Sequence, residues 1–155
     1  MDTPPPMPDD LATFWYLTRR VAGLMDRNGE ALFQRELGIS LAQFLVLSVI
    51  DAHPGPLSQQ QVADRLGLTK GTVSRQIDNA VSAGLVTVQP SPRSRRENAV
   101  FLTPAGTDLV RRGDTAFHQD RAAIQSLVDP DDMRAAIRVL AATDKALGTH
   151  RDAHH

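Results

Sequence analysis

The sequence of 155 residues predicts a mainly α-helical fold with one small β-hairpin, in the α+β class. Three observations predict it: helix-start signals at Ser58 and Thr69, short apolar runs at residues 85–88 and 99–102, and long helical patterns on both sides. This order is that of a winged helix-turn-helix. We assign a disordered tail to residues 1–10, dimerisation helices to 11–38 and 104–148, the winged helix-turn-helix to 39–103, and a second tail to 149–155.

The N-terminal flank follows a proline-rich acidic start. Apolar residues from Leu11 to Met25 recur at helical spacing, and a second helical stretch runs to about Leu37, before Gly38. Ser40 and Gln43 have the spacing of a capping box, which predicts an apolar helix over residues 41–52. The sequence His53-Pro54-Gly55-Pro56 ends that helix.

The next two helices are short and close together. Ser58 and Gln61 again have capping-box spacing, and Gly67 suits the left-handed conformation with which a chain leaves a helix. Thr69 is a good cap for the second helix. Its apolar positions form one stripe at helical spacing: Val73, Ile77, Ala80 and Val81.

The opposite face of this second helix is polar. It carries Gly71, Thr72, Arg75 and Asn79, with Lys70 in the first turn. Such groups suit base edges and phosphates, since arginine pairs bidentately with guanine and a helix N-terminus favours anions. The alternative is the ordinary solvated face of an amphipathic helix.

A hairpin is expected next, because residues 85–88 and 99–102 read as paired strands. The connecting loop over residues 89–98 carries Arg93, Arg95 and Arg96. Arginines projecting beside a helix-turn-helix form a wing that reaches along the DNA backbone or into a narrow minor groove. A solvated hairpin tip is the alternative.

The C-terminal flank has two helix-start signals. Thr103 with Pro104 opens a helix to about Val128, and Asp129 with Pro130 opens a last helix to about Leu147, before Gly148. These flanking helices carry more apolar surface than one small domain covers, for example Leu127, Met133, Ile137 and Leu140. A second copy of the chain would cover it.

These motifs resemble the MarR (multiple antibiotic resistance regulator) family of winged-helix transcription factors. The resemblance is carried by ISLAQFLVLSVI, VADRLGLTKGTVSRQIDNAVSAGLV, the SRREN loop and VFLTPAG. It implies an obligate homodimer, a palindromic DNA operator and often a small ligand that weakens DNA binding. The family's wing usually carries an aspartate that orients its tip arginine; here Arg96 matches the arginine and Ser94 occupies the aspartate position.

Composition agrees with a DNA-binding segment inside a neutral chain. The net charge is −1, yet residues 58–98 hold six basic and three acidic side chains, whereas the segments on either side are net negative. There is no cysteine, which excludes disulfides and thiol-based sensing. Without an apolar run of membrane length or a signal peptide, we expect a cytoplasmic protein with no membrane partner.

We therefore expect a transcriptional repressor that reads a double-stranded, pseudopalindromic operator, with the second helix in the major groove and the wing in the minor groove. A small, anionic aromatic effector is expected at Trp15, Tyr16 and Arg19, because aromatic rings and a guanidinium lie close together in this segment. The alternative is that Trp15 packs in the core and the arginine is solvated. The DNA contacts are assigned to Ser58, Gln60, Thr69, Lys70, Thr72, Ser74, Arg75, Arg93, Arg95 and Arg96.

Other chemistry receives little support from the sequence. Its five histidines do not form the paired spacing of zinc proteases, although zinc sensors occur in the family, and no cofactor or catalytic residue is assigned. Ser48, Asp51 and His53 fall on one helix rather than in a nucleophile elbow. The rival function is a winged helix that binds proteins and has no DNA affinity.

Overall fold

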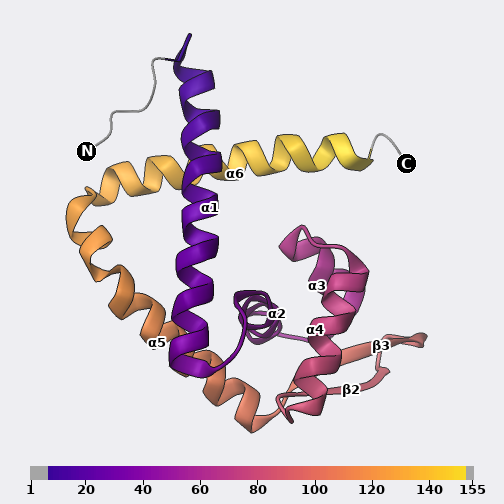
Figure 1. Cartoon of the computed structure of the whole chain (residues 1–155). Coiled ribbons are helices and arrows are strands. Elements are labelled where there is room, and N and C mark those ends of the chain that lie inside the picture. Colours follow the sequence, from indigo (N-terminus) through magenta and orange to yellow (C-terminus); the bar gives the residue numbers. More distant parts are fainter. Residues whose placement is uncertain (1–6, 153–155) are drawn as a thin grey trace. The chain divides into compact units, whose positions relative to one another are not determined.

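The computed structural model describes residues 7–152, with side chains through Gly148. The described residues form two compact units, one that ends at Ala116 and one that begins at Phe117, and this boundary falls within a single helix. The elements of the described part are α1 (Asp10–Leu37), α2 (Leu41–Ala52), β1 (Leu57–Ser58), α3 (Gln59–Leu66), α4 (Lys70–Ser82), β2 (Val86–Ser91), β3 (Ser94–Leu102), α5 (Pro104–Leu127) and α6 (Pro130–Asp152) (Figure 1). The predicted fold class is confirmed.

The winged helix-turn-helix closes around one apolar core in the first unit. Val73, Ile77 and Ala80 of α4 are completely buried. Residues of α2, α3 and the sheet pack in the same cluster, including Leu47, Val62, Leu57 and Val100. Val81, which the sequence pattern placed in the stripe, is instead 43% exposed. It lies next to Ala80, which is completely buried, so Val81 stands at the edge of the stripe rather than at its centre.

The sheet has three antiparallel strands in the order β1-β3-β2. The short strand β1 was not predicted, because two residues show no alternation and Ser58 also caps α3. Leu57 pairs with Val100 and Ser58 with Ala99. Thus β1 attaches the start of the helix-turn-helix to the wing.

The predicted caps of the two short helices are confirmed. Ser58 Oγ accepts a hydrogen bond from Gln61 N at 3.2 Å, and Gln61 Oε1 accepts one from Ser58 N at 2.9 Å. Gly67 ends α3 with φ of 64°, in the left-handed region. Thr69 caps α4 by accepting from Thr72 N at 3.2 Å.

The N-terminal flank is a single helix rather than the two helical stretches expected. Asp9 caps α1, which continues through Asn28 and Gly29 to Leu37. Gly29 is buried, and a Cβ there would lie 3.2 Å from Leu41 Cδ1 of α2. Close packing of α1 on α2 therefore outweighs the weak helix propensity of these two residues.

A second, smaller cluster joins the end of α1 to α2 and α5. The rings of Phe33 and Phe44 stack with centroids 3.9 Å apart, and Leu32 is buried beside them. Gly113 of α5 faces Phe44 so closely that a Cβ would lie 2.1 Å from Phe44 Cε2. In Figure 1, the C-terminal end of α1 accordingly lies beside α2.

The second unit consists of the end of α5 and α6. Helix α6 continues to Asp152, so the predicted helix end near Leu147 and the tail from residue 149 are wrong for residues 149–152. Gly148 has a helical backbone here and does not end the helix. The expected tails at residues 1–6 and 153–155, with the pair His154 and His155, lie outside the described residues.

No single helix among residues 7–152 is both long and apolar enough to cross a membrane. Only α1 and α2 taken together, across a bend of 81°, pass on length and composition.

Candidate nucleic-acid interface

Helices α3 and α4 are joined by a tight turn that begins at Gly67. Leu68 N donates to Ala63 O at 3.0 Å and Gly67 N to Asp64 O at 3.3 Å, which fixes the path of the chain out of α3. Val73 N then donates to Thr69 O as α4 begins. The turn thus presents the first turn of α4 at the surface beside α3.

The polar face of α4 lies at the surface, as predicted. Lys70, Gly71 and Arg75 are exposed, and Thr72 and Ser74 are half-buried. Burial of Val73 and Ile77 on the other side fixes the rotation of the helix. The residues expected to contact DNA therefore share an accessible surface.

Some of the predicted contact residues already have partners inside the chain. Thr69 Oγ1 caps the helix and also lies 2.8 Å from Thr72 Oγ1. Ser58 is engaged in its capping box, and Gln60 Nε2 donates to Asp64 Oδ1 at 2.8 Å. These side chains first hold the helix starts, and only their remaining hydrogen-bonding capacity is open to a ligand.

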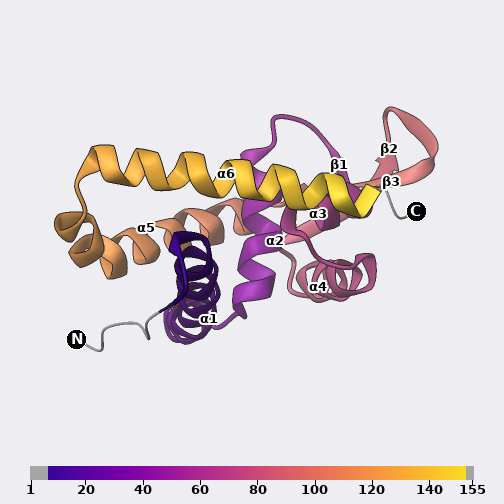
Figure 2. The same cartoon turned by 90° about the horizontal axis from the view of Figure 1, so that it is seen from above.

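The wing is more regular than the sequence indicated. Most of the expected loop over residues 89–98 is strand, and the tip is reduced to Pro92 and Arg93 between β2 and β3. The register shifts between Pro90 and Ser91, and the tip curves away from the plane of the hairpin (Figure 2). Pro90 is tolerated because β2 is an edge strand.

The three wing arginines are exposed but lie in different surroundings. Ser94 Oγ accepts a hydrogen bond from Arg96 N at 3.3 Å, which holds the backbone of that turn. Arg93 Nη2 lies 3.9 Å from the position that a Cβ on Gly55 would occupy. Arg93 therefore folds toward the α2–β1 loop, a placement that the sequence did not reveal.

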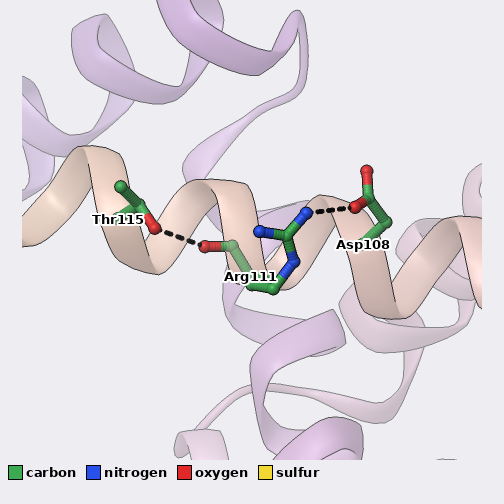
Figure 3. A network of polar contacts seen from close by, with 3 residues as sticks. All are labelled: Asp108, Arg111 and Thr115. Carbon is green, nitrogen blue, oxygen red and sulfur yellow. Dashed lines mark hydrogen bonds and ion pairs between the residues drawn. The ribbon is translucent and has the colours of Figure 1, made fainter.

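Four arginines outside this surface form ion pairs, whereas others, such as Arg27 and Arg112, form none with the described residues. Arg111 pairs with Asp108 at 2.6 Å on α5, where Thr115 Oγ1 also donates to the Arg111 carbonyl (Figure 3). Arg35, Arg121 and Arg134 likewise pair with nearby carboxylates. Within residues 7–148, no ion pair involves the basic candidates of α4 and the wing, which are Lys70, Arg75, Arg93, Arg95 and Arg96.

The aromatic residues expected at an effector site line a hollow. An open cavity of about 880 Å³ lies along the first turns of α1, lined by Trp15, Tyr16, Arg19 and Arg20 together with Met7 and Leu11. Trp15 is 49% exposed, so it is not packed into the core of its own chain. Met7 and Leu11 were not among the predicted lining residues, although they precede Trp15 at helical spacing.

No metal site emerges in the part of the chain that the structure describes, since no three of its His, Asp or Glu side chains cluster. His53 Nδ1 lies 2.8 Å from Gly55 O, so this ring shapes the α2–β1 loop. Ser48 Oγ is buried and has no hydrogen-bond partner among the described residues, and it lies on α2 as expected.

Comparisons with known proteins agree with this geometry. A family model described as "MarR family" matches residues 37–97. An uncharacterized protein of Mycobacterium tuberculosis is 33% identical over 105 residues, which is 68% of this chain and 71% of that protein.

Solved structures share the fold. A MarR family transcriptional regulator from Streptomyces coelicolor, in complex with DNA, gives a TM-score of 0.78 at 17% identity, over 94% of this chain and 93% of that one. Staphylococcus aureus MarR in complex with salicylate and kanamycin gives a TM-score of 0.74 at 20% identity, over 87% of this chain and 90% of that one.

Proposed function

Because the chain belongs to the MarR family of winged-helix transcriptional regulators, we propose that it binds a pseudopalindromic DNA operator as a homodimer and represses transcription there. One observation carries this proposal: the exposed face of α4 and the wing hold basic side chains that make no ion pair with any residue in 7–148. Guanidinium groups left free in this way are available to phosphates and base edges.

In the proposed complex, α4 enters the major groove with Lys70, Thr72, Ser74 and Arg75 near bases or phosphates. Arg95 and Arg96 lie along the flanking backbone or minor groove. Ser58, Gln60 and Thr69 lie at the starts of α3 and α4, where hydroxyl and amide groups commonly position a protein on phosphates. The DNA complex of the Streptomyces coelicolor regulator supports this choice of ligand.

Homodimerisation is proposed from the apolar surface of the flanking helices. Leu11, Val21 and Met25 of α1 are exposed, and so are Ile137 and Leu140 of α6. Exposed apolar side chains along a helix mark an interaction site, and two-fold symmetry would also match the two halves of an operator.

The rival function, a protein-binding winged helix, is separated from DNA binding by one titration. A labelled random duplex is titrated at low and moderate salt with the wild-type protein, Arg96→Ala, and Arg111→Ala as the matched control. We expect binding that weakens steeply with salt, and a loss for Arg96→Ala only, since the Arg111 guanidinium is already paired with Asp108. Absence of wild-type binding at low salt would favour the rival.

A second proposal concerns an effector in the hollow of α1, supported by its aromatic and basic lining. An aromatic carboxylate would stack on Trp15 or Tyr16 and pair with Arg19. The salicylate complex of Staphylococcus aureus MarR supports this ligand class. Trp15 is the only tryptophan in the sequence, so its fluorescence reports on the hollow directly.

The test is a benzoate titration followed by Trp15 fluorescence and by release of bound duplex. We expect a saturable change that Arg19→Gln weakens and the α1 control Arg27→Gln does not. A Trp15 signal that is insensitive to benzoate at millimolar concentration argues against the effector proposal and leaves the DNA-binding proposal intact.

A further inference from the structure

Gly71 is an unfavourable residue for its place in α4. It occupies the second position of the helix, between Lys70 and Thr72, on the exposed face. Glycine is among the poorest helix formers because its backbone loses the most freedom on folding. A glycine in an exposed helical turn therefore calls for a compensating reason.

The fold itself provides no such reason. The backbone of Gly71 does not have a positive φ, and a Cβ built there would meet nothing within 4 Å. The contrast is with Gly106 and Gly113 of α5, where a Cβ would lie 2.1 Å from Leu85 O and from Phe44 Cε2, respectively. Those two glycines permit close packing inside the first unit, whereas Gly71 faces open space.

The position of Gly71 indicates what approaches it. Arg75 follows one turn later on the same exposed face, and its guanidinium forms no ion pair with any residue in 7–148. In a helix-turn-helix, the N-terminal residues of the second helix are those that come closest to base edges in the major groove. Because Gly71 has no side chain, it leaves space on the face of α4 that would contact DNA in the proposed complex.

We propose that Gly71 determines operator specificity by allowing the first turn of α4 to approach the base edges, so that Arg75 reaches its base; this rests on the proposed DNA binding. A methyl group at position 71 would occupy the space of a base edge and hold the helix away from the groove floor. On random DNA, where the contact is mainly with phosphates, the same methyl group would matter little.

The test compares Gly71→Ala with wild type on a palindromic duplex that the wild-type protein enriches from a random pool, and on a random duplex. We expect Gly71→Ala to bind the enriched duplex about tenfold more weakly, similar to one mismatched base pair, with unchanged affinity and salt slope on random duplex. Its melting temperature should be equal or higher, since alanine favours helix.

Gly148→Ala on α6 is the matched control, because a Cβ there also meets nothing within 4 Å. This variant should have a more stable helix and an unchanged affinity for both the enriched and the random duplex. Unchanged affinity of Gly71→Ala for the enriched duplex overturns the inference, and so does an equal loss on both duplexes or a lowered melting temperature. Failure of the wild-type protein to bind any duplex would instead overturn the proposed function.

Discussion

The winged helix-turn-helix and the flanking helices differ in how they treat their apolar side chains. Val46, Leu47 and Ile77 of the winged part are fully buried within one copy of the chain. By contrast, Leu11 in α1 is 72% exposed and Leu127 at the end of α5 is 83% exposed. One part therefore completes its core alone, whereas the other leaves apolar surface uncovered, which is the basis of the proposed homodimer.

The cause lies in the periodicity of the two parts. Each short helix of the winged part has one apolar stripe that faces a neighbouring helix or the sheet. The longer helices α1 and α6 carry apolar residues over many turns, yet only Gly29, Leu32 and Phe33 of α1 are buried. Burial of each further large side chain is worth about 1.5–3 kcal/mol, which would drive the proposed association of two copies.

The largest predicted effect is the loss of the dimer. Removal of all residues after Val128 deletes α6, and we expect no dimer at micromolar concentration together with poor solubility. The milder variant Ile137→Asp/Leu140→Asp keeps the helix but places charge on its exposed apolar face. Sedimentation measures the change; a truncated protein that stays soluble, folded and monomeric contradicts the comparison.

A smaller effect is expected where α5 packs closely against the winged part. Gly106→Ala places a Cβ 2.1 Å from Leu85 O, which belongs to the backbone and cannot move freely. We expect destabilisation of about 1–3 kcal/mol in urea unfolding, because overpacking strains a closed core. Gly113→Ala should cost less, since the opposing Phe44 is a side chain that can shift.

The control for both variants is Gly23→Ala in α1, whose Cβ would approach only the Arg27 guanidinium at 3.8 Å. It should stabilise the protein slightly through helix propensity. If Gly106→Ala proves as stable as this control, the close contact between α5 and Leu85 is not present in solution.

Next in size is the effect of Arg75→Ala on operator binding. A bidentate contact to guanine is worth about 1–3 kcal/mol of discrimination, so the variant should lose that affinity on its enriched duplex and relax its base preference. Folding should be unaffected because Arg75 is exposed and forms no ion pair within residues 7–148. Equal weakening on enriched and random duplex would instead assign Arg75 to a phosphate.

Local signals predicted one part of this fold well. Ser58, Gly67 and Thr69 mark helix ends through bonds to residues at most five positions away, so a short stretch of sequence contains the whole signal. The rotation of α4 also followed from its stripe, apart from Val81. The exposed faces of the candidate DNA-binding site were therefore predictable, whereas their contacts with DNA remain predictions.

Features that depend on distant contacts were not predictable. The continuity of α1 rests on Gly29 against Leu41, and β1 exists only because it pairs with Val100 and Ala99. The sequence predicts a loop over residues 89–98 because arginines and prolines are poor strand residues, yet pairing with β2 extends β3 back to Ser94. The proximity of Arg93 to Gly55 likewise joins residues far apart in the sequence.

The smallest predicted effects concern the wing. Arg96→Ala removes one exposed cation per subunit, so it should weaken operator binding and make the salt slope of the bound dimer shallower by about two units. Arg93→Ala should change the slope less, because the Arg93 guanidinium lies against the α2–β1 loop. Anisotropy titrations across a salt series measure both; an unchanged slope for Arg96→Ala would mean that the wing does not touch DNA.

Ser94→Asp sharpens this result, because Ser94 Oγ accepts from Arg96 N and a carboxylate can accept the same bond. The new carboxylate would order Arg96 before binding, which saves about 0.5–1.5 kcal/mol of side-chain ordering, but it would also repel phosphates. Repulsion is screened as salt rises, since the Debye length is about 10 Å at 0.1 M. We therefore expect Ser94→Asp to bind no worse than wild type at moderate salt and worse at low salt, whereas Ser94→Ala, which loses the bond without gaining charge, should bind slightly worse at both. A Ser94→Asp protein that binds as weakly as Arg96→Ala at moderate salt would show that repulsion outweighs preorganisation in this wing.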